Sequence, residues 1–208
     1  MLPLYLRKMD KLYINRHIRI KDNAVFINGS KEFASEEEDV CRFLRSVYKN
    51  YEIRYRKFYK MDGLSKLGFL AAELLLENPG ISYEPEETAI ILANESSSLN
   101  TDIKYQKTIN DTPSPSVFVY TLPNIVIGEI CIRNEIRGET AFFVQDEFDI
   151  DFICSYVNNI FTDTKTRRCI TGWLELTDDG DYFTHLFLVS DKESETEFNV
   201  ENIKKHIS

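Results

Sequence analysis

Histidine is scarce in this chain of 208 residues, and so are most signs of a standard catalytic site. The three histidines, His17, His185 and His206, lie far apart, and no two of them have the spacing of metal ligands. The sequence has no glycine-rich phosphate-binding motif and no Gly-x-Ser-x-Gly nucleophile elbow. We therefore expect no bound metal, no nucleotide and no other cofactor.

Cysteine pairs and long apolar runs are also missing. The four cysteines, Cys41, Cys131, Cys154 and Cys169, form no Cys-x-x-Cys motif, so they are predicted to be reduced thiols in the core. No apolar run approaches the roughly 20 residues of a membrane span, and the N-terminus has too short an apolar run for a signal peptide. The sequence predicts a cytoplasmic protein.

Positive charge is in deficit, because 25 lysines and arginines face 34 acidic residues, for a net charge of −9. This balance argues against a general nucleic-acid-binding protein, which needs a basic surface. The best basic stretch, residues 54–57, is consistent with a phosphate-reaching loop or with a plain surface connection, and the second is favoured.

Short strands rich in β-branched and aromatic residues alternate with amphipathic helices. Strands are predicted at 12–20, 24–27, 88–94, 141–145, 169–176 and 182–190, and helices at 36–48, 64–77, 125–136 and 149–162. A long polar loop is predicted at 96–115, and a polar tail with one weak helix at 190–208. This order predicts one α/β domain over residues 1–208, with a mixed sheet covered by helices.

Four acidic residues, Asp146, Glu147, Asp149 and Asp151, follow the strand at 141–145. Carboxylates of this kind can bind Mg²⁺ or Ca²⁺. Because they lie where a helix is predicted to begin, and negative charge stabilises a helix start, the structural interpretation is favoured.

The central segment resembles a known family. Residues 120–133, followed by 136–138, resemble the helix and turn that precede the active-site cysteine of β-ketoacyl synthases in fatty-acid and polyketide pathways. The motif residues are Pro123, Asn124, Gly128, Glu129, Arg137 and Gly138. Residues 60–67 resemble the family's Met-Asp helix, and residues 170–175 resemble its strand ending in Gly-Gly-x-Glu. The matches run from residue 57 to 190 in the family's order.

This resemblance implies a fold. The family has the thiolase fold, which consists of two similar βαβαβαββ halves, and the present chain has the length of the first. The implied structure is a thiolase-like half, with a mixed five-stranded sheet and helices on its faces.

The same resemblance implies the loss of catalysis. Counting on from Gly138, the family's cysteine position falls on Glu147, within about one residue, and no Cys or Ser lies between 141 and 150. The family's thiolate attacks an acyl thioester, and a carboxylate cannot hold an acyl chain in that way. The family's assisting histidines belong to the second half. The chain is thus expected to be a pseudoenzyme.

Three hypotheses for function remain open. The first is a non-catalytic subunit of fatty-acid, polyketide or aryl-polyene-type biosynthesis, similar to a chain length factor. It would pair with a ketosynthase-like subunit or an acyl carrier protein, as a homo- or heterodimer, through the strand of Phe142, Phe143 and Val144. The second is an enzyme that uses Glu147 as a general base, assisted by His185. The third is a soluble α/β interaction protein whose resemblance is limited to the fold.

Overall fold

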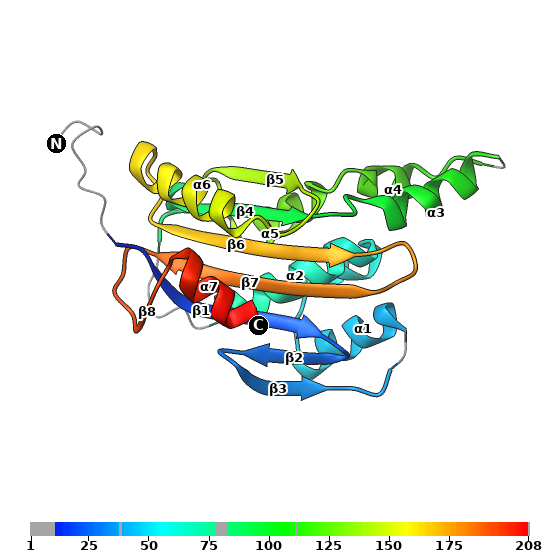
Figure 1. Cartoon of the computed structure of the whole chain (residues 1–208). Helices are drawn as coiled ribbons and strands as arrows, with labels where there is room; N and C mark the ends of the chain where they lie inside the picture. Colours follow the sequence, from blue (N-terminus) through cyan, green and yellow to red (C-terminus); the bar gives the residue numbers. More distant parts are fainter. Residues whose placement is uncertain (1–10, 38, 78–82, 111, 208) are drawn as a thin grey trace.

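The computed structural model describes residues 11–37, 39–77, 83–110 and 112–207, which are built around one mixed β-sheet (Figure 1). The strand order is β3-β2-β1-β7-β6-β4-β5, and β8 pairs with β1 beside this path. The strand bounds are β1 Tyr13–Lys21, β2 Ala24–Ile27, β3 Ser30–Ala34, β4 Thr88–Asn94, β5 Thr140–Val144, β6 Arg168–Leu176, β7 Tyr182–Ser190 and β8 Thr196–Glu197. Strand β4 is parallel to both of its neighbours, and the other pairings are antiparallel.

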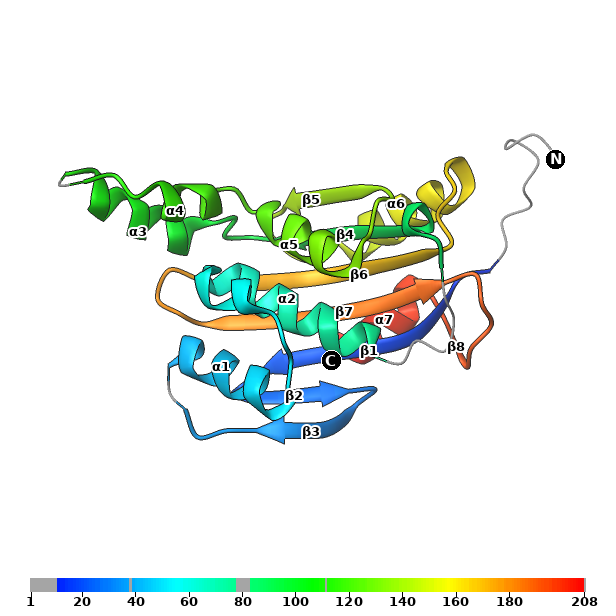
Figure 2. The ribbon, with the colours of Figure 1, turned by 180° about the vertical axis from the view of Figure 1, so that it is seen from behind.

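Helices cover both faces of this sheet. Their bounds are α1 Val40–Asn50, α2 Gly63–Leu76, α3 Leu99–Ile109, α4 Pro115–Phe118, α5 Ile125–Asn134, α6 Ile150–Asp163 and α7 Val200–Ile207, with 3₁₀ turns η2 Arg56–Lys60, η3 Pro85–Glu87 and η4 Val119–Thr121. Helices α6 and α7 lie in front of the sheet in Figure 1, and α1, α2 and α5 lie in front in the reverse view of Figure 2. This arrangement confirms the predicted α/β class with a mixed sheet.

Strand β4 shows why the sequence folds into two layers around a sheet. All seven of its residues are buried. Ile90 and Leu92 belong to the core under α1, α2 and α5, whereas Ala89, Ile91 and Ala93 belong to the core under α6 and α7. A strand covered on both faces needs apolar residues at every position, which accounts for its continuous apolar run.

Helix α2 crosses α5 closely at a glycine. A Cβ atom on Gly68 would lie 2.4 Å from Val126 Cγ2 and 2.8 Å from Leu174 Cδ2. Gly128 on α5 makes no such approach, because apart from its own helix backbone no described heavy atom lies within 4 Å of a Cβ placed there. Gly128 sits on the outer side of α5, and Gly68 makes the contact.

This difference between the two glycines predicts that substitutions at the two positions have opposite effects on stability. Gly68→Val is expected to lower the free energy of unfolding by about 2–3 kcal/mol, because the added atoms overpack the α2–α5 contact. Gly128→Ala should raise the free energy by up to about 1 kcal/mol, since alanine is the better helix former. Urea denaturation of the two variants measures both changes. Equal effects at the two positions would contradict the packing described.

Within the described residues the sheet has eight strands, beyond the five expected from the resemblance. One of the three additional strands, β2, was predicted from the sequence at 24–27. Strand β3 continues the first hairpin, and the two-residue β8 adds to β1. Both segments are short, and β3 is mostly exposed, so neither carries the apolar alternation that identifies a strand.

Two segments expected to be mainly irregular contain helices, and only the second was predicted to contain one. The predicted loop at 96–115 contains α3, which buries only Thr101 and so has little apolar periodicity to signal it. The predicted polar tail contains β8 and α7, and it is anchored by the buried side chains of Phe198 and Ile203. The first helix begins at Val40 rather than at 36, because Asp39 accepts a hydrogen bond from Arg42 N at 2.8 Å and caps it there.

Among the described residues, no single helix combines the length and the apolar character needed to cross a membrane. One bent pair of helical segments, Pro115–Thr121 and Ile125–Asn134, has enough length and apolar character when the two are taken together, and the angle between them is 98°.

Candidate functional site

The parallel strands β4 and β5 end at the same edge of the sheet, which is where α/β proteins commonly place their sites. Asn94 and Val144 are partners in the ladder, and Gln145 N donates to Asn94 O at 2.9 Å just beyond it. Two connections leave this edge: residues 95–98 lead from β4 to α3, and residues 145–149 lead from β5 to α6. The second contains the position at which the resemblance places a nucleophile.

Buried polar side chains hold the first connection. The Glu175 carboxylate, near the end of β6, accepts from Glu95 N at 2.7 Å and from Ser96 N at 3.3 Å. Asn94 bonds the backbone of Ser97 twice, at 2.8 and 3.0 Å. The connection from β4 to α3 is therefore firmly positioned. The resemblance identified Glu175 as a motif residue, but the sequence did not indicate that it binds this loop.

The second connection presents a carboxylate to solvent. Glu147 is exposed, and Phe148 turns inward to pack on Trp173 with 5.5 Å between ring centroids. Asp149 caps α6 by accepting from Phe152 N at 2.9 Å, and Asp151 lies 3.9 Å from Lys204 Nζ. These contacts support the structural interpretation of Asp149 and Asp151. In the part of the chain that the structure describes, no three His, Cys, Asp or Glu side chains are placed to hold a metal ion.

The structure does not bring Glu147 together with His185. Strands β6 and β4 lie between β7, which carries His185, and β5. His185 lines a cavity formed by β1, β7, the β2–β3 turn and α7, and Glu147 is absent from its lining. The geometry of a general base with an assisting histidine is therefore not present, and the second hypothesis loses its support.

The motif residues of the resemblance lie on α5 and just before and after it. Glu129 on α5 is 3% exposed, accepts from Tyr120 OH at 3.1 Å, and lies 2.9 Å from Lys57 Nζ. Burial and the adjacent carboxylate raise the pKa of Tyr120. Because Lys57 forms this ion pair, the basic stretch at 54–57 is at least partly structural.

The ion pair between Lys57 and Glu129 is expected to stabilise the fold, and a control variant separates this effect from a general change in surface charge. Lys57→Met should lower the free energy of unfolding by about 1–3 kcal/mol, because it leaves a buried carboxylate without its cation. Lys60→Met is the matched control, since Lys60 is exposed and has no ion pair within the described residues. Chemical denaturation should show a loss for Lys57→Met alone, and equal losses would contradict the role of Glu129.

The remaining motif residues lie at the ends of α5. Pro123 and Asn124 precede its first turn, and Glu135 ends it in a left-handed conformation with φ 56°. Arg137 N donates to Pro85 O at 2.8 Å. A Cβ on Gly138 would lie 2.3 Å from Thr88 O, so this turn fits against the start of β4 only as glycine. The Arg-Gly turn thus sets the register in which β5 joins β4.

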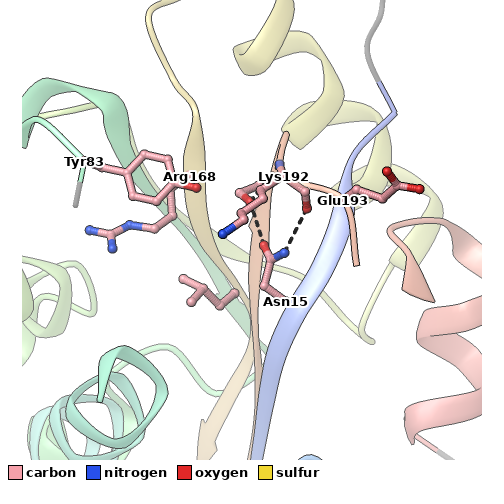
Figure 3. Close-up of a pocket in the computed structure, with 7 residues that line it drawn as sticks. Asn15, Tyr83, Arg168, Lys192 and Glu193 are labelled. Carbon is pink, nitrogen blue, oxygen red and sulfur yellow. Dashed lines mark hydrogen bonds between the residues drawn. The ribbon is translucent and has the colours of Figure 1, made fainter. Parts of the chain in front are cut away.

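A polar pocket lies at the opposite end of the sheet (Figure 3). Its volume is about 200 Å³, and the Arg168 guanidinium lies 4.7 Å from the Tyr83 ring centroid. Asn15 Nδ2 donates to Lys192 O at 2.9 Å, and Ser190 Oγ donates to Asn15 Oδ1 at 2.7 Å. Its polar groups bond to one another, so it is a weaker candidate for a binding site.

The chain has the thiolase-like fold of ketosynthases and chain length factors. No family model matches the chain, and none of the curated proteins matches it either.

Three solved structures illustrate this likeness. The ishigamide ketosynthase/chain length factor superposes with TM-score 0.63 at 15% identity over 89% of this chain. The ketosynthase ApeO in complex with its chain length factor ApeC from Xenorhabdus doucetiae superposes with a TM-score of 0.59 at 11% identity over 88% of this chain. The AntDE:AntF complex, a type II polyketide ketosynthase with its acyl-carrier protein, superposes with a TM-score of 0.61 at 12% identity over 87% of this chain. The present chain spans 64%, 80% and 63% of these chains' own lengths. At these identities the likeness establishes the fold.

Proposed function

We propose that this protein is a non-catalytic, ketosynthase-like subunit that pairs with a ketosynthase-like partner in fatty-acid, polyketide or aryl-polyene-type biosynthesis. The observation that carries the proposal is the corner after β5. It keeps a strand, a turn and a capped helix, but it presents the exposed Glu147 and contains no thiol or hydroxyl nucleophile between 141 and 150. A scaffold retained without its nucleophile suits a partner better than a catalyst.

The edge of β5 supplies a means of pairing. Among the described strands, β5 pairs only with β4, so its other side is free. Glu139 O accepts from Ile90 N, and Gln145 N donates to Asn94 O, both at 2.9 Å. Because backbone groups of successive residues alternate between the two sides of a strand, the odd-numbered residues face β4. The N–H and C=O groups of Thr140, Phe142 and Val144 therefore face outward, available to a strand of another chain.

The side chains expected at the interface divide between the two faces. Phe142 packs on the core beneath α5, and Phe143 contacts the Phe152 and Tyr156 rings of α6 at 4.9 and 5.0 Å. Only Val144 is largely exposed, at 57%. We therefore propose an interface made chiefly by the backbone edge of β5, which the two phenylalanines stabilise from within.

A second element enlarges this surface. Helices α3 and α4 extend beyond the ends of β4 and β5 as an arm (Figures 1 and 2). The exposed apolar side chains of this arm and of the turn η4 that follows it are Leu99, Ile103, Ile109, Phe118, Val119 and Leu122. Exposed apolar groups that gather on one element are typical of an interaction surface. We propose that this arm lies across the partner once β5 has paired.

The lack of catalysis can be tested by intact mass. Incubated with an acyl-carrier thioester that loads an active ketosynthase in parallel, this protein should keep its unmodified mass, because no nucleophile occupies the corner. A covalent acyl adduct on the wild-type chain would contradict the proposal. Glu147→Gln serves as a control for any adduct formed on the carboxylate itself.

A further inference from the structure

All three histidines of the chain meet on the face of the sheet that α7 covers. His17 lies on β1, His185 on β7 and His206 on α7. His17 Nδ1 and His185 Nε2 are 3.1 Å apart, and the ring centroids of His17 and His206 are 4.3 Å apart. Three imidazoles in contact at the joint between a helix and a sheet form a cluster that the proposed subunit function does not use.

A cavity of about 400 Å³ opens beside this cluster. Its basic and polar lining comes from four elements and consists of His17, Arg19, Asn28, His185, Lys205 and His206. None of the described residues that line it is acidic, although acidic residues outnumber basic ones by 34 to 25 in the whole chain. The volume lies within the range of small-molecule sites, about 300–1,000 Å³.

The cations at this cavity have little competing negative charge. In the described part of the chain Arg19 makes no ion pair, and its guanidinium lies 4.7 Å from the Phe26 ring centroid. Lys205 pairs with Glu201 at 2.7 Å, but both side chains are exposed, and such pairs are weak. The adjoining cavity, which His17 and His206 also line, brings in Arg16 and one carboxylate, Glu195.

The imidazoles are held neutral in this surrounding. Burial, followed by the charges of His206 and Arg19, lowers the pKa of His17 to about 4. Burial, followed by His17 and Arg19, lowers the pKa of His185 to about 3. His185 is 1% exposed, and its Nδ1 has no hydrogen-bond partner. A bound anion would stabilise the protonated form of these imidazoles and so would raise both pKa values.

We propose that the cavity between β1, β7, the β2–β3 turn and α7 binds a phosphate group, either as inorganic phosphate or as a small phosphate monoester. A dianion matches the two permanent cations, Arg19 and Lys205, and a guanidinium suits a phosphate because it can donate two parallel hydrogen bonds. Asn28 Oδ1 already accepts from His17 N at 3.0 Å, which leaves the side-chain N–H groups of Asn28 to donate to a ligand.

The three histidine Cε1–H signals in a proton NMR spectrum report on this site directly. Inorganic phosphate is titrated at pH 7.5, where it is mainly the dianion, in a non-phosphate buffer with the ionic strength held constant by sodium chloride. We expect saturable shifts with a Kd of about 1 mM or tighter, together with a higher apparent pKa for at least one histidine. Linear shifts that sodium chloride reproduces would overturn the proposal.

Two variants and a control assign the binding to the cavity. Arg19→Gln should weaken phosphate binding about tenfold or more, and Lys205→Gln, at an exposed position, should weaken it about threefold. Arg45→Gln makes the same charge change on α1, across the sheet, and should leave binding unchanged. Wild-type affinity in both cavity variants would contradict the assignment.

Repeating the titration with methyl phosphate distinguishes the source of the phosphate group. Tighter binding than that of inorganic phosphate indicates a monoester ligand, and weaker binding indicates free phosphate.

Discussion

Acidification from pH 7 to pH 5 is expected to lower the stability of this protein by about 2 kcal/mol through His185 alone. The folded protein holds the pKa of His185 at about 3, whereas the unfolded chain has the ordinary value of 6.5. Below pH 6.5 the unfolded state therefore binds a proton that the folded state does not, and this contribution to stability is lost as the pH falls toward 3. His17, with its pKa at about 4, adds to the loss.

Thermal unfolding followed by circular dichroism measures this effect, in a buffer without phosphate. For a chain of this length, about 2 kcal/mol corresponds to a fall in Tm of about 4–8 °C. Most carboxylates titrate below this pH window, so the histidines dominate it. His185→Gln keeps a polar partner for His17 but cannot take up a proton, and its Tm should depend less on pH. A pH dependence as steep as that of the wild type would contradict the neutral, buried state of His185.

Val144→Pro is expected to weaken the proposed association through the free edge of β5 by about 10- to 100-fold. The substitution removes an outward-facing N–H at the free edge of β5, and the partner's carbonyl is left unsatisfied, at a cost of about 1–3 kcal/mol. The monomer should tolerate it, because proline is accepted on edge strands where its nitrogen faces solvent. Sedimentation equilibrium over a range of concentrations measures the change in the Kd of association, with the protein alone for a homodimer and mixed with its ketosynthase-like partner for a heterodimer.

Val144→Ala provides the control for this prediction. It removes the exposed side chain but keeps the backbone N–H, so the pairing should be largely retained. If Val144→Pro and the wild type associate equally well, then the edge of β5 is not the interface. If Val144→Ala is as damaging as Val144→Pro, then the side chain rather than the backbone carries the interaction.

The parts of the fold that could be predicted are those with strong local signals. Strand β7 was predicted with its observed bounds, and β4 was recognised by its unbroken apolar run. Helix α3 could not be predicted, and the C-terminal segment was predicted only as a polar tail with one weak helix, because the stability of both depends on a few distant contacts. Phe198 and Ile203 pack on the core beneath α6 and α7, and two apolar residues in a polar stretch are too few to indicate this.

The candidate site likewise has a part with a local sequence signal and a part that depends on distant contacts. The corner after β5 could be located because the Arg-Gly turn and the motif before it are local in sequence. The histidine cluster could not, because it depends on the register that places Arg19 opposite His185 and His17 opposite Phe187, and on the docking of α7. The sequence indicated the three histidines only as isolated residues, and their contacts follow from long-range pairing.

Affinity capture from the native organism can show whether this protein is a non-catalytic subunit of a ketosynthase pair. Tagged wild-type protein and the Val144→Pro variant are used as baits, and the captured proteins are identified by mass spectrometry. We expect the wild type to retain a ketosynthase with an intact active-site cysteine, and Val144→Pro to retain much less of it. Recovery of no ketosynthase by the wild type, or of equal amounts by the two baits, would contradict the claim.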